Sequence, residues 1–339
     1  MVKRILNSLK QSASLKWRSF YILPLVLIVC TFLLALISLV HIFTSPYNFI
    51  EKEINIPKHA RTWDTLNKLY HEGILPHPII TISGALFING SPKIMAGDYV
   101  FKAGASPQEM MTMLHKGWVL AHRLTFPEGW TAHEILTEIN NDQRLSGTIS
   151  GTISEGSVFP STYYIHRNQD RNKLIQTMTK TMDKVTHELM QSNKNPFIKT
   201  SKDLIVFASM LEREAANPDE LSKISGVFIN RLNKGMRLQS DPTVIYGITL
   251  GKSSLGRPVN RQDLKVDSDY NTYTRSGLPK GPICCPGLAA LEAAAHPATT
   301  NELYFVLEHD GKAHRFSITY KEHLEHIRRI RNALKVANE

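Results

Sequence analysis

The pattern of apolar and polar positions begins with one long apolar run. Residues 20–40, FYILPLVLIVCTFLLALISLV, contain no acidic or basic side chain. A helix rises 1.5 Å per residue, so this run can cross about 30 Å of hydrocarbon. Pro24 lies near its start, where a proline is tolerated. We predict a transmembrane helix over residues 20–43, and we favour an uncleaved anchor over a cleaved signal peptide because no small-x-small cleavage site follows.

Residues 44–124 carry shorter patterns that predict a small α+β module with two short helices. GDYVF at 97–101 is typical of a strand. Ser106, Pro107 and Glu109 supply a hydroxyl N-cap, a first-turn proline and a carboxylate three residues later, which together start a helix.

Residues 125–339 alternate extended segments with amphipathic helices, which predicts a larger, mixed α/β domain and an α+β fold class overall. Thr131 and Glu134 form a capping box. Residues 203–216, DLIVFASMLEREAA, begin with a run that is apolar on all sides, as in a buried helix. Further predicted elements are helices at 173–191 and 217–235, a helix with Asp241 as N-cap and Pro242 as first residue, a hairpin of 303–307 with 314–318, and a basic helix at 320–336.

Length and charge narrow the class of protein. The chain has 339 residues, of which 42% are hydrophobic, enough for two or so domains and too many for a disordered chain. Its net charge is +10, yet residues 1–19 hold five basic and no acidic side chains, and the remainder lacks the Lys/Arg runs of a nucleic-acid-binding surface. This basic tail is expected to stay in the cytoplasm and the rest of the chain to lie outside the inner membrane.

Cysteine and histidine usage predicts no metal and no cofactor. Cys30 falls in the apolar run, whereas Cys284 and Cys285 are adjacent, so their direct pairing would be strained. No disulfide framework is therefore expected. The 14 histidines form neither an H-E-x-x-H motif nor a Cys/His cluster of zinc-ligand spacing.

Two carboxylates directly follow the buried run of residues 203–216. Desolvation raises the pKa of a carboxyl group, which is what a general acid working near neutral pH needs. Glu212 and Glu214 point about 200° apart on a helix, so they cannot both enter one cleft. Periodicity does not choose between them, and both could equally be salt-bridged or solvated residues at a helix end.

Two later segments combine polar and aromatic residues. Residues 236–247, MRLQSDPTVIYG, are explained by helix capping alone, and residues 270–279, YNTYTRSGLP, have the composition of either a sugar-binding loop or an ordinary surface loop.

Eight blocks of sequence resemble, in order, those of the YceG-like endolytic murein transglycosylases, the MltG family. Together with the single N-terminal span they cover nearly the whole chain. The blocks are TFPEGWT at 125–131, EGSVFPSTYY at 155–164, ASMLEREA at 208–215, GVFINRL at 226–232, MRLQSDPTVIYG at 236–247, YNTY at 270–273, GLPKGPI at 277–283 and AAAHPA at 293–298.

The resemblance implies a LysM-like module after the anchor and then a catalytic domain. It implies cleavage of the β-1,4 bond between N-acetylmuramic acid and N-acetylglucosamine in nascent peptidoglycan, with 1,6-anhydro ends, termination of strand elongation, and membrane-bound peptidoglycan synthases as neighbours. The catalytic glutamate of the family matches Glu212. The residues expected to hold the glycan are Gln239, Asp241, Thr243, Tyr246, Asn271 and Tyr273.

Three positions depart from the family pattern. Ser161 stands where the family usually has Asp, Lys280 where it has a second Pro, and Cys285 where it has Asn. None of the three departures changes the position of Glu212. Serine at position 161 weakens any role that would need a second carboxylate at that position. Two alternatives stay open, namely an inactive, membrane-tethered glycan-binding scaffold and a muramidase that adds water, for which no second acid is identified.

Overall fold

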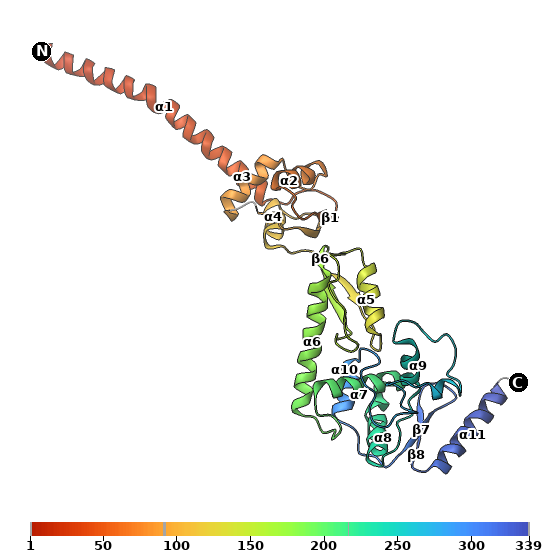
Figure 1. Cartoon of the computed structure of the whole chain (residues 1–339). Helices are drawn as coiled ribbons and strands as arrows, with labels where there is room; N and C mark the ends of the chain where they lie inside the picture. Colours follow the sequence, from red (N-terminus) through yellow and green to blue (C-terminus); the bar gives the residue numbers. More distant parts are fainter. Residues whose placement is uncertain (1, 91–92, 216, 338–339) are drawn as a thin grey trace. The chain divides into compact units, whose positions relative to one another are not determined.

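The computed structural model divides into two compact units, residues 1–121 and 122–339. It describes residues 2–90, 93–215 and 217–337, and Figure 1 labels the helices and some of the strands. Each unit is described by itself below. The side chains of the predicted cytoplasmic tail, residues 1–19, lie outside the described residues.

Unit 1 (residues 1–121) begins with the long helix α1 (Val2–Thr44). Its segment Leu23–Thr44 is long and apolar enough to cross a membrane. The sequence-based prediction of such a helix is thereby confirmed in length and composition, whereas its topology stays a prediction. Pro24 lies inside the helix rather than near its start, because the helix already begins at Val2.

The rest of unit 1 is a two-stranded antiparallel sheet with helices packed around it. Strand β1 (Lys52–Ile56) pairs with β2 (Gly97–Phe101), so that Ile54 lies opposite Tyr99. Their inward side chains join a core that includes Leu66, Leu69 and Met110. The helices between and after the strands are α2 (Thr62–His71), α3 (Pro78–Asn89) and α4 (Pro107–Lys116).

The comparison with the sequence-based expectation is mixed in unit 1. The Ser106–Glu109 capping box of α4 is confirmed, with Ser106 Oγ accepting the Glu109 N–H at 3.2 Å. The expectation of two short helices was wrong, because the described part of the module holds three. Helix α3, PIITISGALFIN, has no charged residue and therefore no polar face to mark a helical period.

Unit 2 (residues 122–339) combines helices with small two-stranded sheets, which confirms a mixed α and β composition. Strands β3 (His122–Thr125) and β5 (Thr162–Ile165) pair antiparallel, β4 (Leu145–Ser146) and β6 (Gln169–Asp170) pair parallel, and β7 (Tyr304–Leu307) and β8 (His314–Ser317) form the predicted hairpin. The helices are α5 (Ala132–Asn141), α6 (Arg171–Gln191), α7 (Ser201–Glu214), α8 (Leu221–Asn233), α9 (Asp241–Thr249), α10 (Leu288–Ala295) and α11 (Tyr320–Ala337), with 3-10 turns η1 (Pro218–Glu220) and η2 (Asp263–Lys265).

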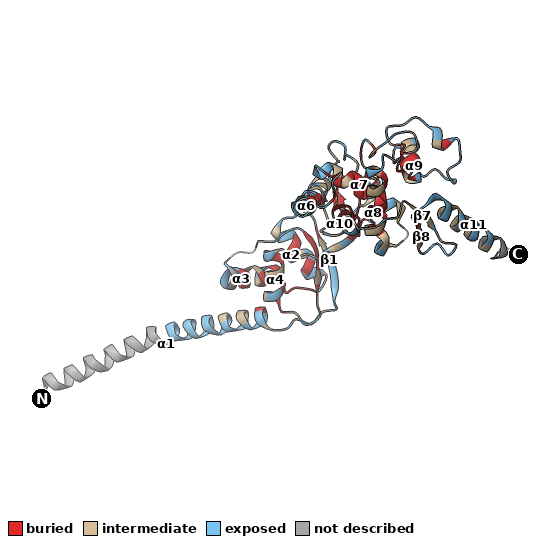
Figure 2. Ribbon diagram, turned by 90° about the horizontal axis from the view of Figure 1, so that it is seen from below, coloured by how far each residue is buried: buried red, intermediate tan, exposed pale blue. Residues whose placement is uncertain are grey.

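Helix α7 lies at the centre of unit 2, packed against α10, α8 and α6. The burial colours of Figure 2 show α7, α8 and α10 mostly red, in contrast to the pale blue of the described part of α1. Phe207 of α7 meets Phe228 of α8 edge to face, with ring centroids 6.1 Å apart. The all-round apolar run therefore marks a buried helix, as its sequence predicts.

One predicted helix start was wrong. Asp241 is the first residue of α9, and Ser240 takes the N-cap position. The Ser240 hydroxyl makes no capping bond because it donates to Glu214 Oε2 instead, at 2.9 Å. The helix therefore begins one residue earlier than predicted, without a side-chain cap.

Candidate active site

The site begins at the C-terminal end of α7. A capping box of Thr200 and Asp203 fixes the start of this helix, and its buried side chains fix its rotation. Ala215 ends the helix, so that Glu212, Arg213 and Glu214 lie on its last turn. The two glutamates face different segments of unit 2, as the angle between them predicts.

Glu212 is half-buried and contacts the N-terminus of α10. Its Oε2 accepts the backbone N–H of Gly287, the N-cap of α10, at 2.9 Å. A carboxylate is favoured there by the partial positive charge of a helix N-terminus. Burial nevertheless raises the pKa of Glu212, and the nearby charge of Glu128 raises it further, while the Gly287 N–H and Arg213 oppose the shift.

Glu128 is a neighbouring carboxylate that sequence reasoning missed. A Cβ added to Gly287 would lie 2.0 Å from the Glu128 carboxyl carbon, so the carboxyl group rests against the bare α-carbon of Gly287. The two glutamates therefore approach the same glycine from different segments. The signal was present in the TFPEGWT block, but nothing local connects that block to residue 287.

Backbone hydrogen bonds hold the Glu128 segment in place. The Gly129 N–H donates to the Cys285 carbonyl at 3.0 Å, and the Cys285 N–H donates to the Trp130 carbonyl at 2.8 Å. Gly129 has φ +79°, a conformation that glycine adopts at little cost. Arg213 Nη1 donates to the Gly129 carbonyl at 3.3 Å, which ties this turn to the end of α7.

Glu214 occupies a closed environment. It accepts the Ser240 hydroxyl at 2.9 Å, and burial raises the pKa of Glu214 to about 7, opposed by that hydrogen bond and by Arg231. A raised pKa alone would thus select Glu214 before Glu212. The buried hydroxyl contact instead makes Glu214 a structural link between α7 and α9.

Three of the six residues predicted to hold the glycan lie near the start of α9 with exposed or half-buried side chains. The Tyr273 hydroxyl donates to Asp241 Oδ1 at 2.6 Å, which joins the loop after η2 to α9. Gln239 is exposed and has φ +53°, an uncommon left-handed conformation for a residue other than glycine. Its N–H donates to the Thr272 carbonyl at 3.2 Å.

Thr243 and Asn271 are placed differently, since they are 0% and 1% exposed. The Thr243 hydroxyl donates to the Ser240 carbonyl at 2.6 Å and lies 2.9 Å from the Thr272 hydroxyl. Asn271 Nδ2 donates to the carbonyls of Leu264 and Val266. Both side chains therefore organise the surrounding backbone.

Tyr246 lines a cleft of about 360 Å³ beside α9, together with Arg213, Glu134 and residues 251–257. Its hydroxyl donates to Glu155 Oε2 at 3.1 Å, and Glu155 also accepts the Ala132 N–H at 2.8 Å. Burial raises the pKa of Glu155. Because Arg213 adjoins Glu212 in sequence, the cleft opens next to the end of α7.

The three departures from the family pattern have local roles. The Ser161 carbonyl accepts the Phe126 N–H at 3.0 Å, and Lys280 forms an ion pair with Asp269 at 2.9 Å. Cys285 is buried, with Sγ 3.9 Å from Glu155 Oε1, and burial raises its pKa to about 12. Cys284 and Cys285 are both free thiols.

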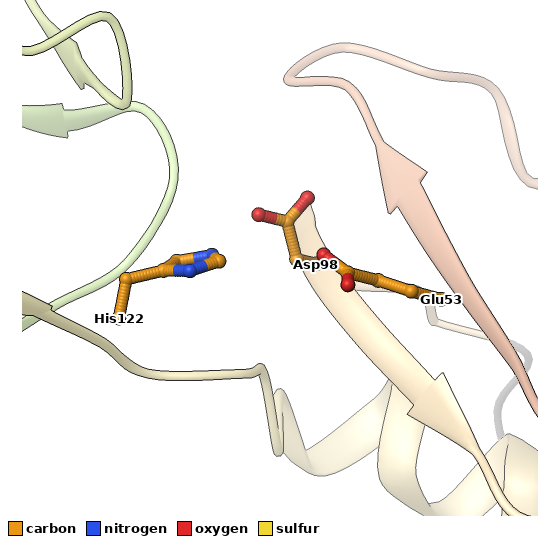
Figure 3. Close-up of side chains that lie close together, drawn as sticks. All are labelled: Glu53, Asp98 and His122. Carbon is orange, nitrogen blue, oxygen red and sulfur yellow. The ribbon is translucent and has the colours of Figure 1, made fainter.

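Three side chains of metal-binding type come from different segments of the chain. Figure 3 shows Glu53 on β1 and Asp98 on β2, together with His122. Asp98 accepts a hydrogen bond from Asn55 Nδ2 at 2.7 Å. His122 is the first residue of unit 2, whereas the carboxylates belong to unit 1, so these residues are not assigned as a metal site.

The fold and the site together define a class: a protein with an apolar N-terminal helix and a carboxyl group suited to acid–base chemistry at the end of a buried helix. A family model described as the YceG-like family matches residues 54–329. The chain belongs to the YceG-like family, as the sequence blocks indicated.

Curated relatives carry one name, endolytic murein transglycosylase. The relative from Bacillus subtilis is 38% identical over 172 residues, which cover 50% of this chain and 46% of that protein. The relative from Streptococcus pneumoniae strain D39 is 27% identical over 303 residues, which cover 75% of this chain and 54% of that protein. The chain thus spans about half the length of these relatives.

A solved structure of a yceG-like protein from Listeria monocytogenes is also similar. It shares 24% identity and a TM-score of 0.49, covering 81% of this chain and 98% of the other.

Proposed function

We propose that this protein is an endolytic lytic transglycosylase that cleaves the β-1,4 bond between N-acetylmuramic acid and N-acetylglucosamine in nascent peptidoglycan. The observation that carries the proposal is the Glu212 carboxyl group, half-buried at the end of α7 and held by one backbone N–H. The names of the curated relatives support the same reaction.

In the proposed reaction Glu212 acts twice. The raised pKa of Glu212 favours the protonated form, which donates a proton to the glycosidic oxygen as the bond from that oxygen to C1 breaks. The ionised carboxylate then removes the proton from the C6 hydroxyl of the muramic acid while the C6 oxygen attacks C1. The product is a 1,6-anhydro ring, no water is consumed, and Glu212 regains its proton.

The contact with Gly287 distinguishes the two oxygens of Glu212. Oε2 accepts the Gly287 N–H, and we assign the transferred proton to Oε1. A single fixed hydrogen bond holds the carboxyl group in orientation without fully stabilising its charge. This balance suits a group that must be an acid first and a base immediately afterwards.

The glycan-binding residues are proposed in two groups. Gln239, Asp241, Tyr246 and Tyr273 would contact the sugar hydroxyls and rings beside the cleft. Thr243 and Asn271 would shape that surface from below, since both side chains are buried in hydrogen bonds to the backbone.

The proposed setting is the inner membrane. Helix α1 would anchor the chain with its N-terminus in the cytoplasm, residues 44–124 would form a LysM-like module, and residues 125–339 would form the periplasmic catalytic domain. The apolar segment of α1 supports the anchor. The proposed role is to end strand elongation next to membrane-bound peptidoglycan synthases.

Product analysis tests the reaction. Full-length protein in detergent is incubated with purified peptidoglycan beside the Glu212→Gln variant, and the released muropeptides are read by mass spectrometry. Anhydro ends from the wild type alone are expected. Glycan binding without products from either protein would contradict the enzyme and favour the inactive scaffold.

A muramidase is the second candidate because Glu128 lies against the same glycine as Glu212. A hydrolase uses two carboxylates, one as acid and one as nucleophile or as base for water. Such an enzyme would leave reducing ends in the same digestion. The mass of each product separates the two reactions, since the anhydro end is lighter by one water.

A further inference from the structure

Helix α3 of unit 1 exposes an apolar stripe. Ile79, Leu86 and Phe87 are 59%, 51% and 62% exposed. Positions i, i+7 and i+8 fall on one face of a helix, so these three side chains face the same side. The helix contains no charged residue. An exposed apolar surface of this kind indicates a site of interaction with a protein or a membrane.

The opposite face of α3 is packed into unit 1. Thr81 and Ala85 are both 0% exposed. The Thr81 hydroxyl donates to the Pro76 carbonyl at 3.0 Å, which fixes the first turn. Because the polar hydroxyl and the small side chains are already buried, the large apolar side chains are the ones left facing outward.

The middle of α3 lies against the end of the apolar segment of α1. Phe43, in the last turn of Leu23–Thr44, is 0% exposed. A Cβ added to Gly84 would lie 2.4 Å from a ring carbon of Phe43, so the glycine allows the two helices to touch. A helix that meets the last turn of a membrane span sits at the height of the membrane surface.

We infer that α3 lies in the interfacial layer of the bilayer that α1 enters, with Ile79, Leu86 and Phe87 among the lipid chains. The helix has 12 residues and is about 18 Å long, too short to cross the hydrocarbon core. Interfacial helices usually need a polar face toward water. In α3 the face opposite the stripe packs against the core of unit 1 and needs no contact with water. The inference rests on the proposed role of α1 as an anchor.

Lipid-dependent quenching tests this contact in the full-length protein. Ile79→Cys and Phe87→Cys are made in a Cys30→Ala background, labelled with an environment-sensitive fluorophore, and reconstituted into phosphatidylcholine and phosphatidylglycerol vesicles. Cys284 and Cys285 are 0% exposed and should escape labelling, which the Cys30→Ala parent checks. Asp64→Cys, an exposed position on the neighbouring helix α2, is the matched control.

We expect phospholipids brominated near the carbonyl end of their chains to reduce the fluorescence at positions 79 and 87, and to leave position 64 unchanged. Equal fluorescence in ordinary and brominated vesicles at positions 79 and 87 would overturn the inference. So would a 79-to-79 disulfide cross-link with no quenching, because a second copy of the chain would then cover the stripe.

The native Cys30 separates this inference from the anchor on which it rests. Cys30 is exposed within the apolar segment of α1, so wild-type protein labelled there should be quenched by bromines deep in the bilayer. No quenching at Cys30 would refute the anchor itself. Quenching at Cys30 but not at positions 79 and 87 would refute only the contact of α3. Leu86→Cys, on the same face, replaces either variant that does not fold.

Discussion

The surroundings of Glu212 and Glu214 differ, although the two carboxyl groups lie two residues apart on one helix. Glu212 accepts the backbone N–H of Gly287, and the Glu128 carboxyl group lies against the same glycine. Glu214 is enclosed and bonded to the Ser240 hydroxyl. Burial raises the pKa of both groups. A raised pKa therefore does not identify the acid of a site, and access to the reacting bond must be considered as well.

The largest effect should come from exchanging each carboxyl for an amide. Glu212→Gln removes the proton donor, so we expect kcat/KM for release of muropeptides to fall by about 10³-fold, the scale of general acid–base catalysis. Glu214→Gln keeps an acceptor for Ser240 and should stay within about 10-fold of the wild type. The measurement is the initial rate on purified glycan strands. A greater loss for Glu214→Gln than for Glu212→Gln would reverse the assignment.

The next effect is on stability and its pH dependence. The pKa of folded Glu214 is about 7, above the ordinary value of 4.5. Between those values the folded state binds more protons than the unfolded state, so the free energy of unfolding falls as pH rises. Glutamine does not titrate, so the Glu214→Gln variant should not lose stability in this way. From pH 5 to pH 8 its free energy of unfolding should rise by on the order of 1 to 3 kcal/mol relative to that of the wild type.

Thermal melting at those two pH values measures the change. The Tm of Glu214→Gln minus that of the wild type should be more positive at pH 8 than at pH 5. Glu188→Gln, an exposed position on α6, is the control and should show the same difference at both values. A pH-independent difference for Glu214→Gln would contradict the assigned pKa.

The Glu128→Gln variant should have a smaller effect, which tells whether Glu128 acts only as a neighbouring charge or as a nucleophile. Its charge raises the pKa of Glu212, so Glu128→Gln should lower that pKa. Glu212 would then lose its proton at a lower pH than in the wild type. The alkaline limb of kcat/KM should move down by less than about one pH unit, because Glu128 is exposed and screened. A loss of about 10³-fold would instead support the muramidase.

Gly287→Ala provides an independent way to displace the same carboxyl group. The new methyl would lie 2.0 Å from the Glu128 carboxyl carbon, which must move away. Gly287 has φ −80°, so alanine is compatible with its backbone. The alkaline limb should move as in Glu128→Gln, and the double variant should show no further movement. Additive movements would mean that the two changes act separately.

The smallest effect is expected at the loop beside α9. Tyr273→Phe removes the hydroxyl that donates to Asp241 at 2.6 Å. The hydrogen bond holds Tyr273 and Asp241 in place for the glycan, so its loss should weaken the free energy of glycan binding by about 1 kcal/mol. We expect a few-fold rise in KM with little change in kcat. Tyr164→Phe, a well-exposed position on β5, is the control. A fall in kcat with unchanged KM would place Tyr273 in the chemical step instead.

The sequence predicts those parts of the fold that depend on neighbours along the chain. The capping boxes at Ser106 and Thr131 act over three residues, and both are present. The period of α6 is equally local, with Leu174, Met178 and Met182 buried. Helix α3 has no charged residue, so no polar face marks its helical period in the sequence.

The candidate site also has features that depend on neighbours along the chain and features that depend on tertiary contacts. Glu212 could be proposed from its position after a buried run, but only the family resemblance chose it over Glu214. The contact of Glu128 with Gly287 joins segments far apart in sequence, and no local pattern encodes it. The burial of Thr243 and Asn271 also depends on tertiary packing, so sequence alone could not separate them from exposed neighbours such as Asp241.

The buried ring of Phe43 has a consequence for biogenesis. This residue belongs to the apolar segment of α1 and also to the core of unit 1. Removal of residues 1–44 would take away the Phe43 ring and leave a cavity beside Gly84. The free energy of unfolding should fall by on the order of 3 to 5 kcal/mol, as for other lost aromatic core residues. The part of unit 1 that follows α1 should therefore complete its folding only once the apolar segment of α1 has reached its final position.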